Sequence, residues 1–227
     1  MEIKQNESNF FAGTLEIDDD SLREKYFEEV WDKIDKQESK MTTQQKIRLK
    51  KVLQRNKVFP VPGKEFATKS RFVHQINLIP GAKPSKCYRY MQQSLAEKSA
   101  TEKQVNEWLN TGVIVPSKSP WAAPVVLVSK KGTDKMRMCV NYRKLNNMTI
   151  KDSFPLPIID DIMHSIGKAS HFGTLDLANG FMQIAMENMD QEKTKCHMGF
   201  FEFTRMPFGL CNAPATFQRS MTEALKR

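Results

Sequence analysis

The chain has 227 residues, of which 40% are hydrophobic and 27% are charged, proportions typical of a folded protein rather than a disordered one. Its formal net charge of +9 favours a polyanionic partner, with nucleic acid as the leading candidate. The N-terminal MEIKQNESN lacks an apolar signal region, and the longest mainly apolar run, WAAPVVLV, is too short to span a bilayer. We therefore expect a soluble protein that is not secreted and has no membrane partner.

The charge is unevenly distributed along the chain. Residues 1–40 hold twelve Asp and Glu against six Lys and Arg, so residues 41–227 hold 29 basic against 14 acidic residues, a balance of +15. We expect residues 1–40 to be an acidic leader with one amphipathic helix. This leader is either a solvated linker or an intramolecular mimic of a polyanion.

Three helices are predicted in the first half of the chain. The first covers residues 21–37, where Ser21 and Glu24 form a capping-box pattern. Its apolar positions at helical spacing are Leu22, Tyr26, Val30 and Ile34. The second follows Thr42 over TTQQKIRLKKVLQRN, and the third, SLAEKSATEKQVNEWLNTG, stops at Gly112 as a C-cap glycine would make it do.

From residue 113 the periodicity changes to that of strands. VIVPS is followed by SPWAAPVVLVSKK, the polar turn GTDK and the alternating MRMCVNYRKLNN, which together predict a β-hairpin. One face of its second strand comprises Met136, Met138, Val140 and Tyr142. The cations Lys130, Lys131, Lys135 and Arg137 either face a ligand or belong to a solvated hairpin tip.

The remaining segments comprise one predicted helix, two strands and a final helix. We predict a helix over FPLPIIDDIMHSIGKA, a strand from Gly173 to Leu177, a strand within GFFEFTRMPFGL and a helix opening at Asn212. The apolar face of the first of these helices comprises Ile159, Ile162, Met163 and Ile166. The order of elements predicts an α+β fold.

Cysteine and histidine form no metal-binding pattern. Cys87, Cys139, Cys196 and Cys211 include no Cys-x-x-Cys pair, and the four histidines are scattered, so we expect no zinc site. Few cysteines in a basic chain indicate reduced thiols and an intracellular, cytoplasmic location.

One carboxylate stands out within an apolar stretch. In HFGTLDLANGFMQIAM, Asp176 follows alternating apolar positions and precedes Asn179 and Gly180. Such a residue either ends a strand or caps a helix, or it binds a divalent cation such as Mg²⁺, which prefers oxygen ligands. This stretch alone leaves both interpretations open.

Six stretches, in this order, resemble the reverse transcriptase domain of gypsy-type LTR retrotransposon Pol polyproteins, which is related to retroviral reverse transcriptases. They are SPWAAPVVLVSKK, MRMCVNYRKLN, FPLPIIDDI, FGTLDLANGFMQI, EKTK and FFEFTRMPFGLCNAPATFQRSM. The resemblance implies a right-hand polymerase with fingers and a partial palm over residues 113–227 and no thumb. Residues 41–112 would form an N-terminal arm and helices that lead into the fingers.

The resemblance also implies a role for Asp176 as the first catalytic carboxylate, which contacts both Mg²⁺ ions of the complete domain. Two such ions clamp the attacking and leaving oxygens of an in-line displacement at phosphorus. Arg137 matches the fingers arginine that braces the incoming deoxynucleoside triphosphate, with Lys130 as its lysine partner. The backbone N–H groups of Leu177 and Ala178 would approach the phosphates.

Further positions follow from the same resemblance. Phe181 matches an aromatic ring beneath the sugar, where it would exclude a 2′-hydroxyl; the alternative is a core phenylalanine after a tight turn. Phe208, in Met206-Pro207-Phe208-Gly209, would form the floor near the template base, with Gln218 on the helix behind it. The implied partners are an RNA or DNA template with its primer and deoxynucleoside triphosphates, within a virus-like particle in an active element.

The sequence also departs from the family pattern. Asn141, the pair Phe181-Met182 and the pair Lys195-Cys196 stand where the family usually has Asp, Tyr-His and Ala-Phe, and none of these changes removes a catalytic group. The family's second catalytic motif, Tyr-x-Asp-Asp or Phe-x-Asp-Asp, is missing, because the adjacent aspartates in EIDDD and PIIDDI both precede Asp176. We therefore expect either an enzyme fragment that is inactive alone or a non-catalytic nucleic-acid-binding relic or co-opted protein.

Overall fold

The computed structural model describes residues 19–36, 41–57, 59, 71–85, 94–129, 136–155, 157–167, 169, 172–174, 176–196 and 200–225. The chain divides into two compact units, residues 1–65 and residues 66–227. The domain boundaries expected after residues 40 and 112 stay predictions. In the part of the chain that the structure describes, no helix has both the length and the apolar character needed to cross a membrane.

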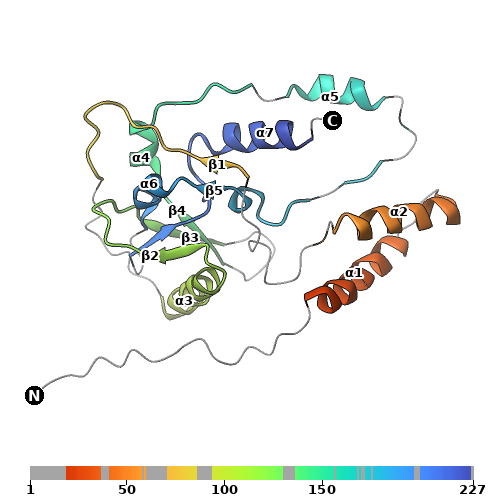
Figure 1. Ribbon diagram of the computed structural model, residues 1–227. Coiled ribbons are helices and arrows are strands. Elements are labelled where there is room, and N and C mark those ends of the chain that lie inside the picture. The colour runs from red at the N-terminus through yellow and green to blue at the C-terminus, as the bar shows by residue number, and fades with distance from the viewer. Residues whose placement is uncertain are drawn as a thin grey trace, which may run out of the picture. The chain divides into compact units, whose positions relative to one another are not determined.

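The chain combines helices with short paired strands, two of the three pairs antiparallel, in agreement with the α+β prediction (Figure 1). The α-helices are α1 (Asp19–Asp35), α2 (Thr43–Arg55), α3 (Leu95–Asn110), α4 (Arg143–Met148), α5 (Ile159–Ile166), α6 (Asn188–Gln191) and α7 (Ala213–Ala224). The strands are β1 (Val73–His74), β2 (Ile114–Pro116), β3 (Val125–Ser129), β4 (Met136–Val140), β5 (Ala185–Met186) and β6 (Phe201–Phe203). Two 3₁₀ helices, η1 (Gly180–Gln183) and η2 (Glu192–Thr194), complete the order.

In the first unit, α1 begins at Asp19, two residues before the predicted start. Ser21 therefore lies inside the first turn, and its prediction as the helix cap is wrong. The buried face of α1 centres on Phe27 and Trp31, which are 4% and 7% exposed. Each of these residues directly follows a residue of the predicted apolar stripe, Tyr26 or Val30. The large aromatic rings determine this face because they remove the most apolar area from water.

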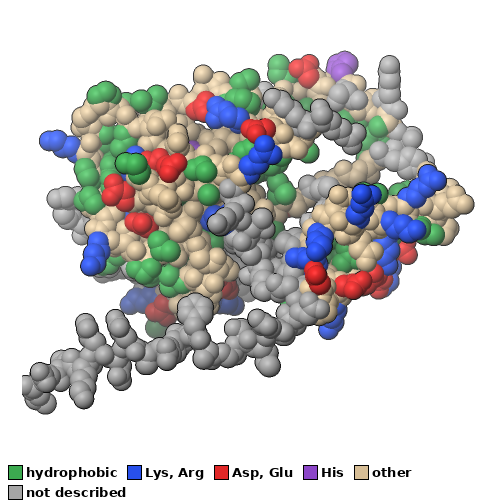
Figure 2. Space-filling view, in the orientation of Figure 1, with side chains coloured by type: hydrophobic (Ala, Val, Ile, Leu, Met, Phe, Trp, Pro, Cys, Tyr) green, Lys and Arg blue, Asp and Glu red, His purple; other side chains and the backbone are tan. Residues whose placement is uncertain are grey.

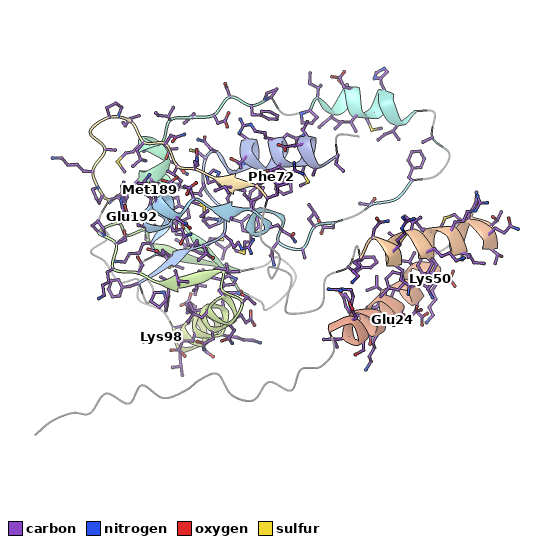
Figure 3. All side chains as sticks on the ribbon, in the orientation of Figure 1. Glu24, Lys50, Phe72, Lys98, Met189 and Glu192 are labelled. Atoms are coloured by element: carbon purple, nitrogen blue, oxygen red, sulfur yellow. The ribbon has the colours of Figure 1, made fainter. Side chains whose placement is uncertain are left out.

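The start of α2 is as predicted, and its cations meet the acidic residues of α1. The Nζ atoms of Lys46 and Lys50 lie 2.8 and 2.6 Å from carboxylate oxygens of Asp35 and Glu28. Lys50 also lies over the Trp31 ring at 5.8 Å and is labelled on α2 in Figure 3. Part of the acidic charge of residues 1–40 therefore pairs with basic residues inside this unit.

The described residues of the second unit form three two-stranded sheets. β1 pairs with β5 in parallel, and the pairs β2–β6 and β3–β4 are antiparallel. The predicted hairpin is thus confirmed, with Val128 opposite Arg137. The largest buried cluster comprises Ile76, Trp121, Ala123, Tyr142, Leu145, Ile184, Met186, Met206, Leu210 and Ala213.

A buried ion pair fixes the segment after β1. The N–H of Ile76 donates to Asp190 Oδ2 at 2.7 Å, and Lys193 Nζ donates to the Ile76 carbonyl at 3.0 Å while it pairs with Asp190. Both backbone groups of Ile76 are thereby satisfied without a longer strand, as buried polar groups require.

The second strand of the hairpin is shorter than predicted. β4 ends at Val140, and Tyr142 precedes helix α4, which the alternating pattern did not predict. The side-chain oxygen of Asn141 accepts the Arg143 N–H at 3.1 Å, which turns the chain into the helix. Tyr142 is 2% exposed, and its hydroxyl donates to the Thr194 carbonyl at 2.8 Å, so its burial does not depend on strand pairing.

The third helix and the last one follow the predictions, whereas two segments differ. α3 is followed by Gly112 at φ +67°, and α7 opens after Asn212. α5 forms, but its apolar face is exposed, with Ile159 74% and Met163 63% accessible. The strand expected from Gly173 to Leu177 is not found in the described residues of that segment. None of the described strands pairs with the segment, and a lone strand is not stable in water.

Candidate active site

Three aromatic rings meet at the turn after Asp176. The Phe181 ring lies 5.2 Å from that of Phe208 and 5.3 Å from that of Phe217, measured between centroids, in tilted and edge-on arrangements. Phe181 is half-buried, whereas Phe208 is 51% exposed, so the aromatic cluster reaches the surface. A side chain at Gly180 would meet the Phe217 ring at 3.1 Å, which explains why a glycine suits this close approach.

The local backbone sets the position of Phe181. Asn179 adopts φ +47°, a left-handed conformation that asparagine tolerates, and η1 follows directly. The Gln183 side chain donates to the Ala178 carbonyl at 2.9 Å and closes this turn. Leu177 and Ala178, the residues expected to approach the phosphates, are both exposed here.

A second turn carries Phe208. Met206 and Pro207 are buried. Gly209 has φ +95°, and a Cβ atom added to it would lie 3.3 Å from the Val140 carbonyl oxygen. The Asn146 amide donates to the Gly209 carbonyl at 2.8 Å and accepts the Cys211 N–H at 3.0 Å. One side chain of α4 therefore holds the chain at two points just after Phe208.

Asp176 lies in an irregular segment, five residues before Phe181. Its side chain is exposed and has no ion-pair or hydrogen-bond partner among the described residues. The carboxylate is therefore open to a ligand from solvent, and the expected strand does not hold it in place.

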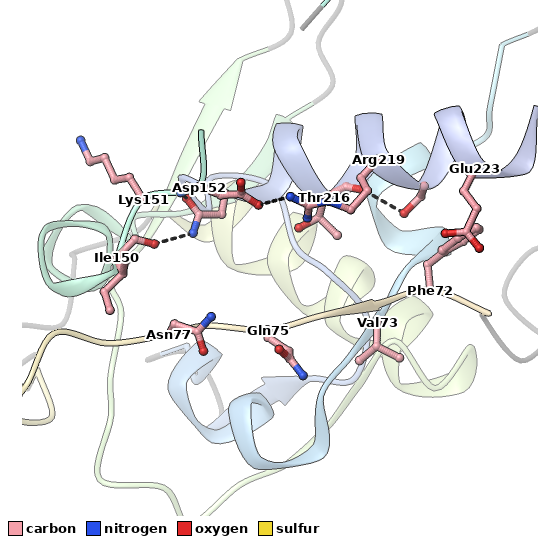
Figure 4. Close-up of a pocket in the computed structure, with 12 residues that line it drawn as sticks. Phe72, Val73, Gln75, Asn77, Ile150, Lys151, Asp152, Thr216, Arg219 and Glu223 are labelled. Atoms are coloured by element: carbon pink, nitrogen blue, oxygen red, sulfur yellow. Dashed lines mark hydrogen bonds and ion pairs between the residues drawn. The ribbon is translucent and has the colours of Figure 1, made fainter. Parts of the chain in front are cut away.

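A pocket of about 320 Å³ lies beside α7, between this helix, the β1 segment and residues 150–152 (Figure 4). Arg219 pairs with Asp152 at 2.8 Å in its wall. Thr216, Arg219 and Glu223 line the pocket at helical spacing, whereas Gln218 lies roughly opposite Thr216, because each residue advances a helix by about 100°. The expected template-side residue and this pocket therefore occupy different faces of α7.

Two buried groups near these elements are held neutral. Burial lowers the pKa of His74 from 6.5 to about 4, although Asp190 and Asp152 act in the opposite direction. His74 Nδ1 and Thr216 Oγ1 share a hydrogen bond of 2.8 Å. Burial also raises the pKa of Tyr142 well above its ordinary value. Both side chains are therefore uncharged at pH 7.

Residues 128–227 match the family model of the reverse transcriptase (RNA-dependent DNA polymerase). Over 131 residues the chain is 47% identical to the Pol polyprotein of transposon 297 from Drosophila melanogaster, and over 130 residues 43% identical to that of transposon gypsy. Residues 128–227, slightly less than half of the chain, are thus similar to the reverse transcriptase family. These alignments cover 55% and 54% of this chain but only 12% and 13% of the two polyproteins, so this chain matches only a small part of their length.

Solved reverse transcriptases share the fold of the chain. The native crystal structure of the prototype foamy virus protease-reverse transcriptase matches with a TM-score of 0.70 and 23% identity, covering 90% of this chain and 27% of that one. The foamy viral protein in complex with an RNA/DNA hybrid gives a TM-score of 0.63 at 20% identity, covering 94% and 28%. The likeness confirms the predicted polymerase fold.

Only part of the predicted site of this reverse transcriptase segment can be located. Lys130 lies outside the described residues, and Arg137 is placed by its backbone on β4, without its side chain. Phe181 and Phe208 are joined by contact between their rings, and Asp176 lies in the irregular segment five residues before Phe181. The nucleotide-binding roles of these residues stay predictions.

The described residues do not form a two-metal site. Among them, no group of three or more His, Cys, Asp and Glu side chains is placed to hold a metal ion. Asp176 is therefore a single carboxylate, which is too few oxygen ligands for a well-bound Mg²⁺.

Sequence reasoning missed Asn146 as a supporting residue. Asparagine is unfavourable inside a helix because its side chain competes for backbone hydrogen bonds. Its position in α4 is known only from the structure, because the sequence pattern extended the strand over this segment, so the sequence carried no signal for the role of its amide.

Proposed function

We propose that this chain supplies the fingers and part of the palm of an RNA-directed DNA polymerase from a retrotransposon Pol polyprotein. The observation that carries the proposal is the position of an exposed Asp176 five residues before a Phe181 ring packed against Phe208 and Phe217. All four residues lie in the segment that matches the reverse transcriptase family.

Phe181 selects deoxynucleotides in this proposal. Its ring is braced on two sides by other rings, so it cannot move aside for a 2′-hydroxyl, and rejection is steric. Lys130 and Arg137 neutralise the triphosphate, and the backbone at Leu177 and Ala178 faces its oxygens. Phe208 and Gln218 contact the template side.

The proposed nucleic-acid partner is a template with its primer. The balance of +15 in residues 41–227 supports this, because cations that neutralise phosphates release counterions. A structural neighbour of the same fold is known in complex with an RNA/DNA hybrid.

Asp176 would supply one carboxylate to a divalent metal that polarises the reacting phosphate. The remaining ligands are not found among the described residues, so the proposal for this chain concerns binding and positioning. We also propose an intracellular location, which the free thiols of Cys139 and Cys211 support.

A chimaera tests the proposed function. The Pol sequence of transposon 297 that follows the aligned region is fused after Arg227, and extension of a DNA primer on an RNA template is measured. We expect extension, and we expect Asp176→Asn to abolish it while Asp190→Asn, the buried structural carboxylate, changes stability instead. Extension that survives Asp176→Asn would overturn the assigned role of Asp176.

A second candidate function is non-catalytic binding of nucleic acid. It is favoured by the irregular segment around Asp176, since a catalytic carboxylate needs a fixed geometry. A chimaera that binds an RNA–DNA hybrid but extends no primer would favour this second candidate.

A further inference from the structure

The cations of α2 form two distinct sets. Lys46 and Lys50 are half-buried and pair with carboxylates of α1. Arg48, Lys51 and Arg55 are exposed, and none of the three has an ion-pair partner among the residues that the structure describes. Pairing with α1 therefore neutralises one face of α2 and leaves the other face positive.

The three exposed cations lie along a single stripe. Positions 48, 51 and 55 are separated by three and four residues, a spacing that places side chains on the same side of a helix. At a rise of 1.5 Å per residue, the stripe is about 10 Å long. α2 contains no acidic residue, so no charge of its own offsets the stripe. Figure 2 shows Lys and Arg side chains gathered over this helix.

We propose that Arg48, Lys51 and Arg55 bind the phosphate backbone of an RNA–DNA hybrid. Phosphates of one strand succeed one another at about 3.4 Å along a duplex axis, so the stripe spans about three of them. Arginine suits such a surface because its planar guanidinium binds phosphate oxygens bidentately. The site lies in residues 1–65, outside the matched residues 128–227, and it extends the nucleic-acid binding of the proposed function.

The same stripe does not suit a membrane surface. Ile47 and Val52 are exposed beside it at 51% and 54%, and α2 contains no aromatic residue. Helices that bind membrane surfaces bury a broad apolar face, usually with Trp, Phe or Leu. The charge therefore favours a partner recognised through its phosphates alone.

The test compares two variants of the full 227-residue chain that lose the same charge. One carries Arg48→Gln, Lys51→Gln and Arg55→Gln. The control carries Lys25→Gln, Lys33→Gln and Lys36→Gln, which are exposed cations on or just after α1 in the same unit. Binding to a fluorescent RNA–DNA hybrid is measured by anisotropy at several salt concentrations, and circular dichroism shows whether each variant keeps its helices.

We expect the α2 variant to lose about tenfold or more in affinity at low salt, and the slope of log K against log salt to become shallower by about 2 to 3. The α1 variant should change the slope by less than about 1. Equal losses in both variants would mean that only net charge matters and would overturn the proposal. A charge-retaining variant, Arg48→Lys with Arg55→Lys, should keep the slope even if glutamine disturbs the helix.

Two further outcomes separate this inference from the proposed function. If the unmodified chain does not bind the hybrid, the proposed function fails together with the stripe. If the unmodified chain binds the hybrid and the α2 variant binds it equally well, the role proposed for Arg48, Lys51 and Arg55 is wrong, and the proposed function is unaffected. Loss of binding to phosphatidylserine vesicles, with hybrid binding unchanged, would identify a membrane surface instead and overturn the proposal.

Discussion

Asn146 binds Gly209 across the turn that carries Phe208, with Nδ2 donating to the Gly209 carbonyl at 2.8 Å. The same amide accepts the Cys211 N–H at 3.0 Å. The turn at the surface of the aromatic cluster is thereby anchored to the helix that follows the hairpin. A backbone hydrogen bond from the Met206 N–H to the Ile184 carbonyl holds the start of the turn, and the Asn146 side chain holds its end.

Replacing Asn146 with alanine should lower the free energy of unfolding by about 1–2 kcal/mol, because two hydrogen bonds are lost. Urea unfolding of the 227-residue chain measures the change. Asn147→Ala is the control, since this exposed neighbour in α4 has no hydrogen bond from its side chain among the described residues. Equal destabilisation by both substitutions would mean that helix propensity, not the amide, determines the result.

Gly209→Ala should destabilise the chain by about 1–3 kcal/mol. The new methyl would lie 3.3 Å from the Val140 carbonyl, and the backbone at φ +95° disfavours any side chain. Gly173→Ala provides the comparison, because nothing lies within 4 Å of its Cβ position. The difference is measured by thermal unfolding, and no difference between the two would contradict the geometry of this turn.

His74 should make stability depend on pH between about 6.5 and 4. Its pKa is lowered on folding, so the unfolded chain binds more protons in this range, and stability is fully present above pH 6.5 and lost as pH falls toward 4. The total loss from a shift of this size is about 3 kcal/mol. Unfolding measured from pH 7.5 to 4.5 should show it.

The His74→Gln variant should flatten this pH dependence, whereas His164→Gln, at an exposed position of α5, should leave it unchanged. Asp152 titrates below this window, since the hydrogen bond from Arg219 lowers the pKa of its carboxyl. An unaltered pH profile in His74→Gln would show that other groups cause the dependence.

Phe181→Ala in the active chimaera should raise incorporation of ribonucleotides by about tenfold or more relative to deoxynucleotides, because the proposed selection is steric. Single-nucleotide extension with each substrate measures the ratio. Phe181→Tyr keeps the ring and should keep the selectivity. If Phe181→Ala still rejects ribonucleotides as strongly as its parent, Phe181 serves only to pack against Phe208 and Phe217.

A polypeptide limited to residues 1–227 should not extend a primer, even with Mg²⁺, template and all four deoxynucleotides. Two divalent ions repel each other, and Asp176 alone cannot hold both where the reaction needs them. Primer extension by the purified polypeptide, resolved on a gel, checks this. Template-directed extension that withstands Asp176→Asn would contradict the metal argument altogether.

Local signals in the sequence were sufficient for several elements. Thr42 and Gly112 delimit helices as predicted, since a capping side chain and a left-handed glycine act within one turn. The polar turn between two alternating segments likewise identified the β3–β4 hairpin. Such features depend on neighbouring residues, which a sequence displays directly.

Contacts between distant residues could not be predicted in this way. The parallel pairing of Val73 with Ala185 involves strands of only two residues, which are too short to show a period. Tyr142 fitted the strand pattern, yet it lies just before α4, where its hydroxyl donates to the Thr194 carbonyl. In the candidate site, Asp176 and Phe181 came from the family resemblance, whereas the Asn146 amide required the fold.

The ion pair that fixes Ile76 also has a consequence for synthesis of the chain. Ile76 is bound by Asp190, 114 residues later, and among the described strands β1 pairs with β5 alone. Since a nascent chain leaves the ribosome from its N-terminus, β1 must wait with unpaired edges until this later segment has emerged. Such edges are templates for association with other chains. Ribosome stalling before residue 185 should therefore leave a nascent chain that depends on chaperones to stay soluble.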